Sequence, residues 1–137
     1  MKIVYITNAR LPTEKAHGVQ IVKMSEAFSG LNNDVTIISP NRVQKEISHK
    51  TDIFNFYDIE ILFEHKLVNF VDPYAYRHLM PKFVYRFFSF IVNLLWGFKS
   101  AKLGKKLNGD FYIFRDNTPF SFLFSAFYSQ KCVVEFH

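Results

Sequence analysis

The 137-residue sequence lacks the features that mark several common protein classes. It has one cysteine, Cys132, so an internal disulfide is impossible and a reducing compartment fits. Neither G-x-G-x-x-G nor G-x-x-x-x-G-K-[ST] occurs, which argues against a dinucleotide-binding dehydrogenase and against a P-loop protein. No D-x-D pair is present, and the five histidines are scattered instead of grouped at ligand spacing. We therefore expect no metal site and no cofactor.

The charge of the chain is distributed unevenly. The formal net charge is +5, but the segment from Pro73 to Gly109 holds seven basic residues and no acidic one. The rest of the chain holds ten basic and twelve acidic residues. A local field of one sign indicates an anionic partner.

Apolar and β-branched runs alternate with helical patterns along the chain. KIVYIT at 2–7 and DVTIISP at 34–40 predict buried strands. Between them, four apolar residues at helical spacing (Ile21, Met24, Phe28 and Leu31) predict a helix that ends near Gly30. Further strands are expected at 59–67, 110–116 and 131–137, and helices at 76–107, interrupted near Pro81 and Gly97, and at 118–130. The order predicts one α/β domain over 1–137: a Rossmann-like parallel sheet with helices on both faces.

The loop after the first strand is the first candidate site. Ligands of open α/β sheets bind beyond the carboxyl ends of the strands, where a helix N-terminus offers backbone N–H groups. Gly18 would let a phosphate approach the backbone closely, and His17 and Lys15 add donors. A single glycine is a weak pattern, so a plain tight turn with a solvated His17 is the favoured alternative.

Two more candidate groups lie at the ends of later strands. Glu135 and His137 are two residues apart on the final strand and so point to one face, where His137 would donate to a sugar hydroxyl or phosphate. Arg115, at the end of the 110–116 strand, suits anion binding. The alternatives are a polar fringe at a strand end for the first pair and a surface ion pair for Arg115.

The basic segment contains a strongly apolar helix, FVYRFFSFIVNLLWGF at 83–98. Its uncharged part is 12 residues long, whereas about 20 are needed to span a bilayer. One interpretation is a helix packed on the sheet with a basic outer side. The other is an interfacial patch on an anionic membrane, with Trp96 and Phe98 at the boundary. The candidate membrane-surface residues are Arg86, Trp96, Lys99, Lys102, Lys105 and Lys106. Nucleic acid is disfavoured because no groove-reading motif is present.

Residues 2–40 resemble the opening of GT-B glycosyltransferases of the family 4 type. Shared features are a strand, a proline-containing loop, a glycine-bearing turn and a helix that leads to a "V-T-hydrophobic" strand. DFYIFRD and VVEFH resemble strand ends of the same family. The resemblance implies two Rossmann-like domains around a cleft, with the nucleotide-sugar donor held mainly by the C-terminal domain and the acceptor by the N-terminal one.

The resemblance also implies roles for single residues. Gly18 matches the turn glycine whose backbone approaches the donor diphosphate, and His137 matches a histidine near the transferred sugar, a catalytic position. The reaction would be metal-independent and retaining. The family usually has two adjacent glycines in the turn, whereas this chain has His17 and Gly18.

These features together predict the acceptor-side part of a glycosyltransferase. The expected acceptor is a glycan or lipid-linked acceptor in cell-envelope polysaccharide synthesis, at the cytoplasmic face of the membrane. Because no second domain follows in the sequence, we expect the chain to be a fragment that is inactive alone. The alternative is a non-catalytic α/β module that binds a nucleotide or phosphate.

Overall fold

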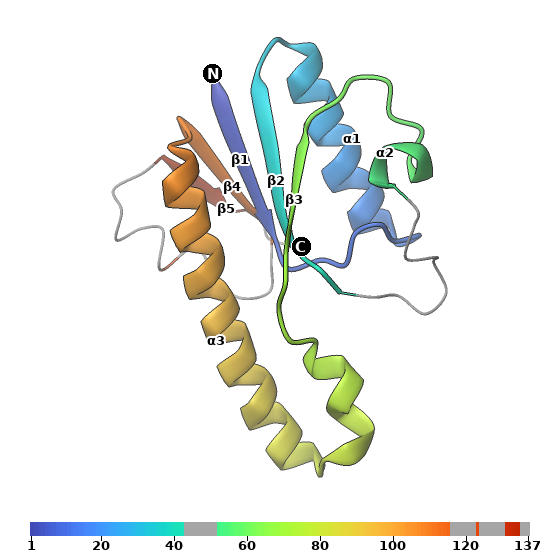
Figure 1. Cartoon of the computed structure of the whole chain (residues 1–137), viewed down its shortest axis with the longest axis vertical. Helices are drawn as coiled ribbons and strands as arrows, with labels where there is room; N and C mark the ends of the chain where they lie inside the picture. The colour runs from blue at the N-terminus through green and yellow to red at the C-terminus, as the bar shows by residue number, and fades with distance from the viewer. Residues whose placement is uncertain (43–51, 116–122, 124–130, 135–137) are drawn as a thin grey trace.

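The computed structural model describes residues 1–42, 52–115, 123 and 131–134 (Figure 1). Within these residues, five parallel strands form one sheet in the order β3-β2-β1-β4-β5. Every strand therefore ends at the same edge of the sheet. The strands are β1 (Lys2–Thr7), β2 (Asp34–Pro40), β3 (Glu64–Val68), β4 (Phe111–Arg115) and β5 (Cys132–Val134).

Helices cover both faces of the sheet, and alternate residues of β1 supply the two cores. Tyr5 packs with Ile21 of helix α1 (Ala16–Gly30) on one face. Ile6 packs with Trp96 of helix α3 (Lys82–Leu107) on the other. The short helix α2 (Ile53–Phe56) joins the α1 side, and the 3-10 helix η1 (Pro73–Leu79) precedes α3. The predicted α/β fold with helices on both faces is confirmed.

Several predicted boundaries need correction. β1 and β2 have the predicted bounds, but β3 begins at Glu64 and not at residue 59. The Glu26 carboxylate of α1 accepts hydrogen bonds from the backbone N–H of Glu60 (2.7 Å) and Ile61 (3.3 Å), and so holds this stretch outside the ladder. Gly97 does not interrupt α3, because it is buried within the helix. The predicted helix at 118–130 lies outside the described residues except for Leu123.

η1 and the first half of α3 form a hairpin that projects past the carboxyl edge of the sheet (Figure 1). The Asp72 side chain caps η1 by accepting a hydrogen bond from the backbone N–H of Tyr74 at 3.1 Å. The rings of Tyr76 and Phe88 pack edge to face, with centroids 6.0 Å apart, and so join the two arms. The η1–α3 hairpin thus stands beside the edge where ligands of such sheets bind.

Candidate functional site

The N-terminus of α1 lies at the carboxyl edge, directly after the loop that follows β1. Its N-cap residue is Lys15, whose side chain makes no cap hydrogen bond, and the first turn holds no acidic residue. The positive end of the helix dipole is therefore not offset by an acid of its own first turn. This arrangement favours an anion.

Three of the predicted site residues gather at this helix end. The pKa of His17 is lowered by partial burial and by the nearby charges of Lys15 and Arg115, so the imidazole is neutral at pH 7. Arg115, at the end of β4, is only 8% exposed, and its guanidinium donates to the Gln20 side chain of α1 at 2.6 Å. Lys15, His17 and Arg115 form what we call the basic edge cluster.

Gly18 is explained by packing within the protein. A Cβ atom at this position would lie 2.3 Å from Thr13 Cγ2 and 2.7 Å from Tyr57 Oη. The Tyr57 hydroxyl in turn accepts a hydrogen bond from the Thr13 N–H and donates one to the Thr13 carbonyl, both at 2.7 Å. The glycine thus lets α1 start against the loop that Tyr57 holds. Close approach by a phosphate stays a prediction.

A second polar network at the same edge was not predicted from the sequence. Arg10 pairs with Asp72 at 2.7 Å, and Arg42 Nε lies 4.0 Å from the other oxygen of that carboxylate. Arg42 also donates to the Asn8 carbonyl, and the Asn8 amide donates to Asn93 of α3 at 3.2 Å. The one available signal was that Arg10 and Arg42 each follow closely on the end of a predicted strand. The network ties the loop after β1 to the base of the η1–α3 hairpin.

The structure corrects one candidate of the membrane-surface group. Trp96 is 0% exposed and packs on the sheet, with its ring 5.6 Å from that of Phe70. It does not lie at a membrane boundary, because it occupies the face of α3 that covers β1. The basic members of the group, Arg86, Lys99, Lys102, Lys105 and Lys106, are exposed.

The predicted residues Glu135 and His137 lie outside the described residues, and their roles stay predictions. Among the described residues, no three His, Cys, Asp or Glu side chains gather as metal ligands. In the same part of the chain, no helix is both long and apolar enough to cross a membrane.

A comparison with solved structures finds a glycosyltransferase from Rickettsia africae ESF-5, with a TM-score of 0.56 and 17% sequence identity. The match covers 99% of this chain and 29% of that chain. The chain therefore has a fold found in a glycosyltransferase, and it spans less than a third of that protein. No protein-family model and no curated protein matches the sequence.

Proposed function

We propose that this chain is the acceptor-side domain of a metal-independent, retaining glycosyltransferase of the GT-B fold and family 4 type. The proposal is supported by a fold shared along 99% of the chain with a glycosyltransferase. The observation that carries it is the basic edge cluster at the N-terminus of α1. Such a cluster suits the diphosphate of a nucleotide-sugar donor, which would be the substrate and not a bound cofactor.

The chemistry follows from the charge that develops during transfer. When the bond from the sugar to the diphosphate breaks, negative charge grows on the leaving oxygen. Lys15, Arg115 and the dipole of α1 would stabilise that charge in place of a metal ion. The neutral His17 would donate a hydrogen bond without adding a charge. We propose His137 as the catalytic residue near the transferred sugar, and Glu135 as the group that orients it.

The acceptor would be a glycan or a lipid-linked sugar of cell-envelope polysaccharide synthesis. The η1–α3 hairpin stands beside the carboxyl edge, so an acceptor bound there would have this helical pair as a wall (Figure 1). The second domain of a GT-B enzyme would hold most of the donor, so we expect no transfer by the 137 residues alone.

The direct test is transfer of radiolabelled sugar from UDP- and GDP-sugars by the protein encoded by the complete gene. Lys15→Gln should lower the affinity for the donor about tenfold or more, because it removes a charge-assisted contact. Lys23→Gln, on the same helix but paired with Glu26, is the matched control and should bind donor normally. A chelator should leave the rate unchanged.

Two results would contradict the proposal in different ways. Nucleotide binding that depends on Lys15, without transfer from any donor, would support the non-catalytic binding module instead. Loss of transfer on chelation would show that a metal, and not the basic edge cluster alone, offsets the charge of the diphosphate.

A further inference from the structure

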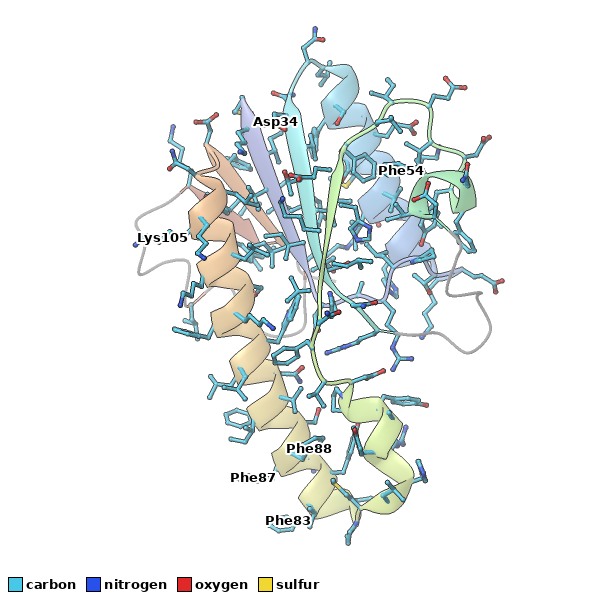
Figure 2. The ribbon with its side chains drawn as sticks, in the orientation of Figure 1. Asp34, Phe54, Phe83, Phe87, Phe88 and Lys105 are labelled. Atoms are coloured by element: carbon cyan, nitrogen blue, oxygen red, sulfur yellow. The ribbon has the colours of Figure 1, made fainter. Side chains whose placement is uncertain are left out.

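The end of the η1–α3 hairpin exposes a group of large apolar side chains. Leu79 is 66% exposed, Phe83 82%, Val84 44% and Phe87 65%. We call these four residues the hairpin tip. Figure 2 shows Phe83 and Phe87 at the end of the hairpin that is farthest from the sheet. Four neighbouring apolar side chains in water form an exposed patch of the kind that marks an interaction site.

Basic residues flank the hairpin tip along the chain, and the guanidinium of Arg77 lies over the Tyr74 ring, 5.7 Å from its centroid. Arg77, Lys82 and Arg86 are all exposed, and the whole segment from Pro73 to Gly109 contains no acidic residue. The patch has apolar side chains at its centre and cationic side chains flanking them. It would therefore fit a partner with an apolar interior beneath a layer of anionic groups. A bilayer with anionic headgroups has this layered chemistry.

The same charges disfavour the other occupants of such a patch. A second copy docked tip to tip would bring two sets of cationic side chains together with no acid from this segment to pair them. A nucleic acid would contact the cations through its phosphates but would leave the phenylalanines without an apolar partner.

We propose that the hairpin tip inserts into the interface of an anionic bilayer, with Arg77, Lys82 and Arg86 on the lipid phosphates. Insertion is shallow, since no described helix is long and apolar enough to cross the membrane. The contact belongs to the tip and not to the whole of α3. Lys105 lies 22 residues beyond Phe83, which is about 33 Å along the helix, and Figure 2 places it near the opposite end. Electrostatic attraction to lipid falls off within about 8 Å.

This orientation turns the carboxyl edge of the sheet toward the membrane, because the hairpin projects past that edge (Figure 1). If the proposed function holds, a lipid-linked acceptor would reach the basic edge cluster without leaving the bilayer. Membrane binding itself does not depend on that function, so the two proposals are tested separately.

The first experiment is co-sedimentation of the full chain with vesicles of phosphatidylcholine alone, or of phosphatidylcholine mixed with phosphatidylglycerol. We expect binding to the mixed vesicles that weakens as salt rises. Leu79→Ser should weaken it about tenfold, whereas Leu62→Ser, at a 70% exposed leucine in the loop before β3, should not change it. Arg86→Gln should weaken it about fivefold, and Lys106→Gln, at the far end of α3, should have no effect.

The second experiment reads insertion directly. Trp96 is the one tryptophan of the chain and is buried, so the native protein should show little quenching by brominated lipids. Phe83→Trp should gain a signal that the bilayer shifts to the blue and brominated lipids quench, and Leu62→Trp should not. Equal binding to both vesicle types, or no binding to either, would overturn the proposal. So would a Phe83→Trp signal that brominated lipids do not quench. A dimer that forms without lipid and that Leu79→Ser dissociates would overturn it as well.

Discussion

Replacing Gly18 with alanine tests whether this glycine serves the packing of the protein. The added methyl carbon would lie 2.3 Å from Thr13 Cγ2, whereas carbon atoms in contact are about 3.5–4.0 Å apart. Both sides of the contact are constrained. Thr13 is 2% exposed, and its backbone is held by the hydroxyl of Tyr57. The start of α1 or the loop must therefore move by more than an ångström.

The expected cost follows from two opposing terms. Forcing an extra methyl group into a packed site costs about 1–3 kcal/mol, and the short contact places this case toward the upper end. Alanine is favoured over glycine inside a helix by at most about 1 kcal/mol, and by less in the first turn. We expect Gly18→Ala to lower the free energy of unfolding by about 2 kcal/mol, measured by urea denaturation.

Gly30 provides the matched control on the same helix. A Cβ atom there would meet only Ile61 Cδ1 at 3.1 Å, the end of a side chain that is 45% exposed and able to turn away. Gly30→Ala should be neutral or stabilising by up to about 1 kcal/mol. Thr13→Ser removes the clashing Cγ2 atom and keeps the hydroxyl, so it should recover about 1 kcal/mol of the cost of Gly18→Ala in a double-mutant cycle.

Either of two results would refute a packing role for Gly18. One is equal stability of Gly18→Ala and Gly30→Ala, and the other is no recovery of stability when Thr13→Ser is added to Gly18→Ala. If Gly18→Ala were fully stable and lost only donor binding, the glycine would serve the ligand, as the sequence resemblance implies.

Changes at three further positions test other parts of the structure. Burial lowers the pKa of His65 to about 4, so the unfolded chain binds more protons between pH 6.5 and 4. Stability should fall by about 2 kcal/mol as the pH drops from 7 to 5, and the His65→Gln variant should lose this slope in urea titrations. Asp72→Asn keeps the cap on η1 but removes the charge that pairs with Arg10 at 2.7 Å, so a loss of about 1 kcal/mol is expected. Asp72→Ala, which also removes the cap, should cost about 1 kcal/mol more. Tyr57→Phe leaves the buried N–H and carbonyl of Thr13 without the tyrosine hydroxyl, at a cost of about 2 kcal/mol. For each of these variants, an unchanged free energy of unfolding would show that the contact it removes does not stabilise the fold.

The first βαβ unit and the edge of the sheet at which three candidate residues meet could be predicted from the sequence. β1 and β2 are apolar runs closed by polar residues, so their bounds were correct. In a parallel sheet all carboxyl ends meet at one edge, so Lys15, His17 and Arg115 were expected together, although Arg115 is far from the other two in the sequence. Both inferences needed only local pattern and topology.

The other features depend on contacts between distant segments. The apolar helix at 83–98 has few polar residues to mark an outer face, so the sequence left open whether Trp96 faces the sheet or the solvent. The Leu31 side chain is 73% exposed although its spacing matched the predicted stripe, because it caps the end of α1. The packing role of Gly18 depends on Tyr57, which approaches it only in the folded chain.

Asp72 connects the two proposals structurally. One of its oxygens accepts from Arg10 in the loop that leads to α1, and the other caps η1 at the base of the hairpin. Trp96 packs on the sheet and fixes the second arm of the hairpin through α3. Because both arms are anchored, a hairpin tip held in a bilayer would fix the height and tilt of the basic edge cluster above the membrane. The contacts of Asp72 and Trp96 would then set the orientation of the basic edge cluster relative to the membrane. Asp72→Ala should make that orientation less fixed, although it removes no residue of the basic edge cluster or of the hairpin tip.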